Sequence, residues 1–277
     1  MNDISIFFAH IEDAARQENL PLAEVCQRVK AFGFDAVEMD AARLYDHADE
    51  LLAAAKGAGL RVNCINTFFD FGKDDAADEA AMDRALALCE PAGCKNLLAI
   101  PGFLTPEEMD RSSAGFADHR ERMAKALRVL CKKAAALGVT ILMEDFDADI
   151  APYYNGEELL WFMENVEGLK CGFDTGNFAY AEEDAAELLP KFLPHIGMVH
   201  CKDRGFTEND GNPKLTVTGK KLYPVAVGDG DLPIGSMVKT ILASGYTGTF
   251  AGEHYDSKHQ LRDMERSAKF LKALVTA

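Results

Sequence analysis

Four short apolar segments in the second half of the chain each end in a residue that can bind a metal ion. "TILME" ends in Glu144, "LKCGFD" in Asp174, "IGMVH" in His200 and "GTFAGE" in Glu253. Three carboxylates and one imidazole form a ligand set that suits Mn²⁺, Mg²⁺, Co²⁺ or Zn²⁺. If the four side chains meet in space, the sequence predicts one divalent metal ion among them.

The grouping of these residues matters more than any one of them. A single carboxylate at the end of a strand is typical of a salt bridge or a helix cap, whereas a cluster of such residues indicates a metal site. Three buried carboxylates without a cation repel one another, and their pKa values rise. A bound metal ion offsets that repulsion and leaves coordination positions open for substrate oxygens.

The elements that must position these residues alternate along the whole chain. Short β-like runs are followed by longer helical patterns, which indicates parallel β-α units. A Gly-rich turn, which would favour an open nucleotide-binding sheet, is missing from "FFAHIEDAARQ" after the first strand. We therefore expect an α/β fold, a single (β/α)8 TIM barrel over residues 1–277, with its site at the carboxyl ends of the strands. The expected strands are Ile4–Ala9, Ala36–Met39, Leu60–Asn66, Asn96–Ile100, Val139–Glu144, Leu169–Asp174, Ile196–His200 and Thr247–Glu253.

The connections between strands carry two further signals. Several helices are expected to end at a glycine just before a strand, at Gly33, Gly59, Gly138 and Gly245. Glycine readily takes the left-handed conformation that closes a helix. One long polar connection, residues 203–224, follows the seventh strand. Connections of that length in compact domains are usually functional or mobile.

The composition narrows the classes of partner and location. The formal net charge is −16, and the densest basic clusters are only "CKK" at 131–133 and "GKK" at 219–221, so nucleic acid is a poor partner. Seven cysteines without a C-x-x-C pair are typical of buried thiols in a reducing compartment. The first residues lack a basic leader, and no apolar run approaches about 18 residues, so we expect neither secretion nor a membrane partner. The sequence predicts a cytoplasmic protein.

The motifs around the candidate ligands resemble those of a known family. "MEDF", "FDTGN", "MVHCKD", "VGDGDLP" and "GEHY", together with "GFDAVEMD" at 33–40, are similar to the sugar isomerase/epimerase group of the xylose-isomerase-like barrels. That superfamily also contains ketose 3-epimerases, hydroxypyruvate isomerase, inosose dehydratase and the endonuclease IV type of DNA repair enzyme. The resemblance covers nearly the whole chain. It implies a single divalent metal ion held by Glu144, Asp174, His200 and Glu253.

The resemblance also implies that Glu144 and Glu253 act as acid and base on opposite faces of the substrate. A metal ion on the oxygens of a ketose stabilises the enediolate that forms when the α-proton leaves. One carboxylate can remove that proton and the other can return it. Return from the opposite face gives an epimer, and return to the neighbouring carbon gives aldose–ketose isomerisation. We therefore expect a metal-dependent isomerase or epimerase of a small sugar, sugar acid or sugar phosphate. Loss of a β-hydroxyl from the same intermediate makes an inosose or sugar-acid dehydratase the alternative.

One departure from the family pattern argues against a nuclease. Many members have Asp-x-x-His on the sixth strand, where this chain has Asp174-Thr-Gly-Asn177. Asn177 can hydrogen-bond a substrate hydroxyl but is a poor metal ligand. The segments "NCINTFFDFG" and "LLAIPGF" also lack the histidines that the nuclease has after its third and fourth strands. An endonuclease IV-like activity is therefore disfavoured.

Further residues are predicted to contact the carbohydrate substrate. Lys202 faces inward because side chains alternate along a strand, and with Arg204 it is a candidate to steady an enediolate or a terminal phosphate. His10 follows the first strand, and Phe68, after the third, is a candidate wall of a sugar pocket. The resemblance adds Glu38 at the end of the second-strand signature.

Two predictions concern the surroundings of the site and the class of function. His254 follows Glu253 and by alternation points away from the ligands, so we expect it to pack behind them. The alternative from a different class is a barrel that keeps the ligands for structure or binds a sugar as a sensor. A homo-oligomer is compatible with the sequence.

Overall fold

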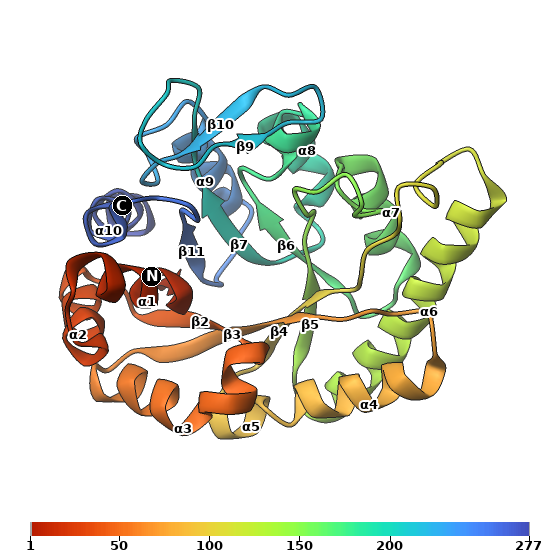
Figure 1. The fold of residues 1–277 in the computed structure, drawn as a ribbon, viewed down its shortest axis with the longest axis horizontal. Coiled ribbons are helices and arrows are strands. Elements are labelled where there is room, and N and C mark those ends of the chain that lie inside the picture. The colour runs from red at the N-terminus through yellow and green to blue at the C-terminus, as the bar shows by residue number, and fades with distance from the viewer. Residues whose placement is uncertain (1, 277) are drawn as a thin grey trace.

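The computed structural model describes residues 2–276 and contains a closed barrel of parallel strands (Figure 1). Around the barrel the order is β1-β11-β7-β6-β5-β4-β3-β2. Barrel strands that follow one another in the sequence are therefore neighbours in space, and β11 closes the barrel against β1. The predicted TIM barrel is confirmed. The barrel strands are β1 (Ile4–Phe7), β2 (Ala36–Asp40), β3 (Arg61–Phe68), β4 (Asn96–Ile100), β5 (Thr140–Met143), β6 (Lys170–Asp174), β7 (Ile196–Lys202) and β11 (Phe250–Glu253).

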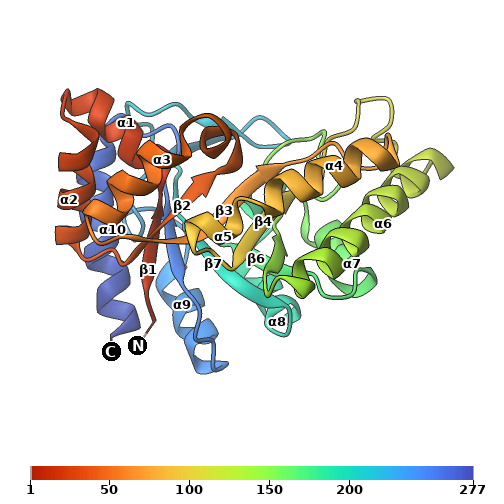
Figure 2. The same cartoon turned by 90° about the horizontal axis from the view of Figure 1, so that it is seen from below.

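Helices lie outside the barrel and join successive strands (Figure 2). Two connections hold a pair of α-helices, α1 with α2 and α4 with α5, and a third adds the 3-10 helix η1 before α8, where the alternation predicted one helix each. None of the helices within residues 2–276 is long and apolar enough to cross a membrane. The helices are α1 (Phe8–Glu18), α2 (Leu22–Phe32), α3 (Ala41–Gly57), α4 (Asp75–Leu86), α5 (Cys89–Ala92), α6 (Ala114–Ala136), α7 (Gly156–Asn165), the 3-10 helix η1 (Phe178–Ala181), α8 (Ala185–Phe192), α9 (Ile234–Ala243) and α10 (Gln260–Val275).

The boundary between β1 and α1 differs from the prediction. The strand ends at Phe7 and the helix begins at Phe8, so the expected strand Ile4–Ala9 is two residues too long. The apolar run continues past the strand because Phe8 and Ile11 form the buried face of α1. Hydrophobicity alone therefore gave no sign of the turn.

The predicted glycine helix ends are confirmed by the backbone. The φ angles are 108° at Gly33, 74° at Gly59, 67° at Gly138 and 89° at Gly245. Residues with a Cβ atom rarely adopt such angles, so glycine is needed where each of these helices turns back toward the barrel.

Strand β6 shows how alternation places a ligand inside the barrel. Phe173 points outward and packs against Phe178 and Phe192, with ring centroids 5.6 and 5.8 Å away. Gly172 faces inward, where an added Cβ would lie 3.2 Å from a methyl of Leu98. Asp174, two residues further along, therefore faces the interior at the carboxyl end of the strand.

The long polar segment after β7 forms a small antiparallel sheet in the order β8-β10-β9 (Figure 1). Its strands are β8 (Arg204–Gly205), β9 (Lys214–Leu215) and β10 (Lys221–Pro224). Asp203 fixes the start of this sheet, because its carboxylate accepts the backbone N–H groups of Gly228, Gly230 and Leu232 at 2.9, 3.0 and 3.3 Å. The "VGDGDLP" turn is thereby held against the end of β7.

Candidate metal centre

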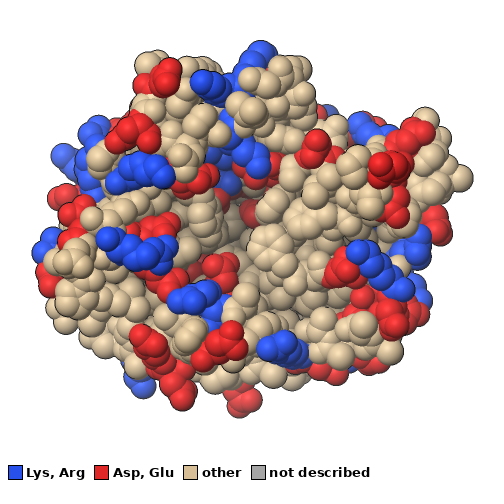
Figure 3. All heavy atoms as spheres, in the orientation of Figure 1, with Lys and Arg blue, Asp and Glu red and all other residues tan. Residues whose placement is uncertain are grey.

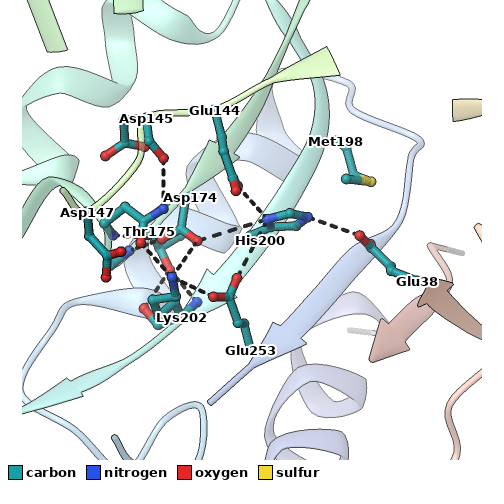
Figure 4. Close-up of polar contacts among 12 residues, drawn as sticks. Glu38, Glu144, Asp145, Asp147, Asp174, Thr175, Met198, His200, Lys202 and Glu253 are labelled. Atoms are coloured by element: carbon teal, nitrogen blue, oxygen red, sulfur yellow. Dashed lines mark hydrogen bonds and ion pairs between the residues drawn. The ribbon is translucent and has the colours of Figure 1, made fainter. Parts of the chain in front are cut away.

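The four predicted ligands converge at the carboxyl end of the barrel (Figure 4). Glu144 follows β5, Asp174 ends β6, His200 lies in β7 and Glu253 ends β11, and these strands are consecutive in the barrel. One ligand atom from each of Glu144, Asp174 and His200 lies within 4.8 Å of the other two. The Oε2 atom of Glu253 is 3.7 Å from His200 Nδ1. The side chains are therefore close enough to share one ion.

The ring of His200 has a carboxylate on each side. Its Nδ1 atom is 2.7 Å from Glu144 Oε2, and its Nε2 atom is 3.1 Å from Glu38 Oε2 (Figure 4). Glu38 is held in turn by Ser5 Oγ at 3.2 Å and Asn63 Nδ2 at 3.4 Å. A histidine whose second nitrogen is bound to a carboxylate presents the first nitrogen in a fixed orientation.

Burial and neighbouring charges shift the pKa values of His200 and the carboxyl groups around it. Burial lowers the pKa of His200, but Glu144 and Glu38 together raise that pKa well above its ordinary value. Burial also raises the pKa values of Glu144 and Glu253. The raised pKa of His200 favours a proton on the imidazole between the two carboxylates, and a metal ion bound at Nδ1 would take the place of that proton.

Lys202 lies beside the ligands, with its ammonium against Glu253. Its Nζ atom is 2.5 Å from Glu253 Oε1 and 2.5 Å from Asn177 Oδ1. Burial acts against the charged form, but Asp174 and Glu253 raise the pKa of Lys202 above its usual value. The amide of Asn177 also donates to the backbone oxygen of Asp145 at 2.8 Å, so both ends of that amide are hydrogen-bonded. This arrangement favours a hydrogen-bonding role for Asn177 over metal binding.

Asp174 gives a direct test of whether a cation fits. Its Oδ1 atom accepts the backbone N–H groups of Gly176 and Asn177, both at 2.7 Å. Its Oδ2 atom is buried and has no hydrogen-bond partner in the part of the chain that the structure describes. The nearest cation to this oxygen is the ammonium of Lys202, at 3.7 Å, which is beyond hydrogen-bond distance. A buried carboxylate oxygen without a hydrogen bond is costly, and a metal ion between Asp174, Glu144 and His200 Nδ1 would satisfy it. The residues present fit a divalent metal ion.

A cavity of about 630 Å³ opens above this cluster, a size common for small-molecule sites. Figure 3 shows the face of the molecule hollowed near its centre, with acidic and basic side chains around the hollow. One wall is aromatic, because the ring of Phe68 lies 5.8 Å from that of Phe146. The predicted residues that line the cavity are Phe68, Glu144, Asn177, Lys202, Arg204 and Glu253.

Glu38 and His10, predicted to contact the substrate, are absent from the residues that line this cavity within the described chain. Glu38 is 1% exposed, because its carboxylate is bound to His200 Nε2. His10 lies in α1, where its Nε2 atom accepts the backbone N–H of His254 at 3.1 Å and its ring stacks on that of His254 at 4.6 Å. His254 is thus buried against another histidine, and contacts of Glu38 and His10 with a substrate stay predictions.

The cavity is also lined by residues that the sequence analysis did not single out, among them Asn66, Thr67, Asp147 and Lys214. The amide atoms of Asn66 and the hydroxyl of Thr67 are buried and have no hydrogen-bond partner among residues 2–276. Both stand near the carboxyl end of β3, so the reading of strand ends that found the metal ligands would also have found them. Asp147 lies in the connection after β5 and Lys214 in the two-residue strand β9, where the sequence carries no comparable signal.

Comparison with known proteins agrees with this architecture. No curated protein matches the chain. A magnesium complex of a xylose isomerase-like TIM barrel protein from Mycobacterium smegmatis is 19% identical, with a TM-score of 0.68 over 92% of this chain and 88% of that one. D-psicose 3-epimerase with D-tagatose from Clostridium cellulolyticum H10 is 16% identical, with a TM-score of 0.71 over 99% of each chain. The probable 3-DHS dehydratase AsbF from Bacillus anthracis is 15% identical, with a TM-score of 0.70 over 98% of each chain.

At these identities the solved structures establish a shared fold. The family model described as "Xylose isomerase-like TIM barrel" matches residues 26–274, which is most of the chain. Its span includes the strands that carry Glu144, Asp174, His200 and Glu253. This chain belongs to the xylose isomerase-like TIM barrel family.

Proposed function

We propose that the protein is a divalent-metal-dependent isomerase or epimerase of a small sugar, sugar acid or sugar phosphate. The observation that carries the proposal is the convergence of three carboxylates and His200 Nδ1 at the floor of a cavity of small-molecule size. Structural neighbours named as an epimerase and a dehydratase support an enzyme that acts on small carbohydrates.

The proposed ligands are Glu144, Asp174, His200 and Glu253. The mixture of carboxylate and imidazole suits Mn²⁺, Mg²⁺, Co²⁺ or Zn²⁺, and the magnesium complex of a structural neighbour is consistent with that range. When bound, such an ion supplies positive charge that stabilises negative charge developing on substrate oxygen. The protein fixes the geometry, because Glu38 orients the imidazole and backbone N–H groups orient Asp174.

Glu144 and Glu253 are the proposed acid and base. They come from β5 and β11 and both line the cavity, so each can reach a substrate above the cluster. Burial raises the pKa of each carboxyl group, which brings its basicity closer to that needed to remove a proton near neutral pH. Proton removal by one glutamate and return by the other would invert a carbon or move a carbonyl to its neighbour.

A dehydratase is the second candidate, and Lys202 is the observation that favours it. The ammonium of Lys202 lies 2.5 Å from Glu253 and lines the cavity, so a positive charge stands next to a proposed base. Such a cation can hydrogen-bond a departing hydroxyl and stabilise the negative charge that develops on it after proton removal. Formation of a product with new carbonyl absorbance and no epimer would select the dehydratase.

The test is proton exchange between substrate carbon and solvent. Ketoses and aldoses incubated with the protein and Mn²⁺ in heavy water should gain deuterium at the carbon next to the carbonyl. Glu144→Gln and Glu253→Gln should each abolish that exchange, whereas the exposed control Glu187→Gln should keep it. Metal content is measured in parallel to separate lost binding from lost proton transfer. Exchange at the wild-type rate in either glutamine variant would remove that residue from the mechanism.

A further inference from the structure

The small sheet β8-β10-β9 brings two cationic side chains to the cavity. Arg204 is the first residue of β8 and Lys214 the first of β9, and both line the cavity. A single carboxylate lies between them: Asp147 Oδ2 is 3.0 Å from Arg204 Nη2, and Asp147 Oδ1 is 3.4 Å from Lys214 Nζ. Two positive charges therefore share one negative charge at this point.

Arg204 is held in place on both its backbone and its side chain. Its N–H donates to Asp203 Oδ1 at 2.8 Å, its C=O accepts from Asp231 N–H at 2.9 Å, and it pairs with Pro224 of β10. Its side chain is 7% exposed. The Nε–H of the guanidinium nevertheless has no hydrogen-bond partner among the described residues. A buried donor left without a partner is costly unless a ligand or water satisfies it.

The charge of this pair is opposite in sign to the net charge of the whole chain. The chain has a formal net charge of −16, so its overall field repels anions. A buried arginine with free donor capacity beside a second cation opposes that field locally. The planar guanidinium also matches the geometry of a carboxylate or phosphate group.

We propose that the substrate carries a terminal oxyanion, a carboxylate or a phosphate, which binds Arg204 and Lys214 at the end of the cavity. This proposal rests on the proposed function and names the substrate class of the same site. Lys202 and Arg204 are two residues apart, a separation of about 7 Å in extended chain. That length suits a short polyhydroxy acid or sugar phosphate, with its reacting carbons near Lys202 and its charged end at Arg204. Asp147 is then an internal competitor that the substrate anion displaces.

Three probes of equal carbon number test the site: sorbitol, gluconate and sorbitol 6-phosphate. Their binding is measured by calorimetry in EDTA, so that chelation of a metal ion by gluconate plays no part. At least one of the anions should bind about tenfold or more tightly than sorbitol, and which one does so distinguishes a carboxylate from a phosphate ligand. Equal affinity for all three probes would overturn the proposal.

Single substitutions test which residues cause the preference for an anion over sorbitol. Arg204→Gln should remove the advantage of the anion over sorbitol, and Lys214→Gln should reduce it. The exposed control Lys221→Gln, on β10 of the same sheet, should keep it. Asp147→Asn should increase the advantage, because it removes the competing carboxylate. Anion preference that survives in Arg204→Gln, or that is lost in Asp147→Asn, contradicts the proposal.

The outcome is separable from that of the proposed function. Anion preference in EDTA together with failed deuterium exchange in the presence of Mn²⁺ would reject the isomerase and keep the oxyanion site. Deuterium exchange with neutral sugars together with equal affinity for the three probes would keep the isomerase and reject the oxyanion site.

Discussion

His200 and the pair formed by His10 and His254 lie at the same end of the barrel, and the side chains around them differ in charge. His200 is fully buried between Glu144 and Glu38, and its pKa is raised well above the usual value. His10 is equally buried, but it faces His254, and burial together with the charges of His254 and Lys202 lowers its pKa well below the usual value. Burial is the same in the two cases, and the neighbours decide the direction.

The hydrogen bonds of the two groups agree with those directions. His10 Nε2 accepts the backbone N–H of His254, which requires that nitrogen to be unprotonated. His254 Nδ1 lies 2.6 Å from Gln260 Oε1, an uncharged partner. The first group is therefore suited to exchange a proton for a metal ion, whereas the second is suited to neutral packing behind the site. Ligand and supporting histidines can be told apart by the charge of what they touch.

Of the substitutions that test the difference between His200 and His10, replacement of His200 should have the largest effect, and that effect is on metal affinity. His200→Gln removes a proposed ligand, so the affinity for Mn²⁺ should fall by more than the roughly 10- to 100-fold expected for loss of a residue that only orients a ligand. His10→Gln should leave Mn²⁺ affinity within a few-fold of wild type. Titration calorimetry measures both variants, and equal losses would remove the distinction between the two histidine groups.

The next largest effect is expected at Glu38, the carboxylate that orients His200 without lining the cavity. Glu38→Gln keeps the shape but weakens the hold on the imidazole, so Mn²⁺ affinity should fall by about 10- to 100-fold. The exposed control Glu50→Gln should bind Mn²⁺ as wild type does. Unchanged metal affinity in Glu38→Gln would show that the orientation of His200 does not depend on this carboxylate.

The smallest effect concerns stability and pH. Because the pKa of His10 lies below its ordinary value of 6.5, the unfolded chain takes up a proton below about pH 6.5 that the folded chain refuses. As pH decreases from about 7.5 to 5.5, His10 should therefore lower the free energy of unfolding by on the order of 1 kcal/mol, whereas His200 and Glu253, whose pKa values are raised in the folded chain, act in the opposite direction.

His10→Gln tests that contribution, because it removes the titrating ring. Urea unfolding in EDTA at the two pH values should show that acidification favours unfolding less in His10→Gln than in wild type, by on the order of 1 kcal/mol. His195→Gln, at a partly exposed position before β7, should keep the wild-type difference. A wild-type pH difference in His10→Gln would assign the loss to other groups.

Much of the fold and the main cluster followed from the sequence, for a simple physical reason. In a parallel barrel every strand ends at the same rim. The polar residues that end four neighbouring strands must therefore lie close together, and these are Glu144, Asp174, His200 and Glu253. β3 also ends in polar residues at this rim, but Asn66 was not among the predicted site residues.

Other features depend on contacts that no local pattern records. The hydrogen bond between Glu38 and His200 joins β2 and β7, which are strands distant in the sequence. The small sheet contains strands of two residues, too short for any periodic signal, and so the meeting of Lys214, Arg204 and Asp147 could not be foreseen. The cytoplasmic location and the homo-oligomer remain predictions.

The five residues from His200 to Arg204 link the proposed metal site to the proposed oxyanion site, so a substitution in one is expected to affect the other. Five consecutive residues include a proposed metal ligand, the buried lysine, the aspartate that anchors a turn and the arginine of the proposed oxyanion site. Because Asp203 ties this stretch to three backbone N–H groups, a shift of one part moves the rest. A substitution in this stretch would therefore be expected to alter turnover and substrate preference together.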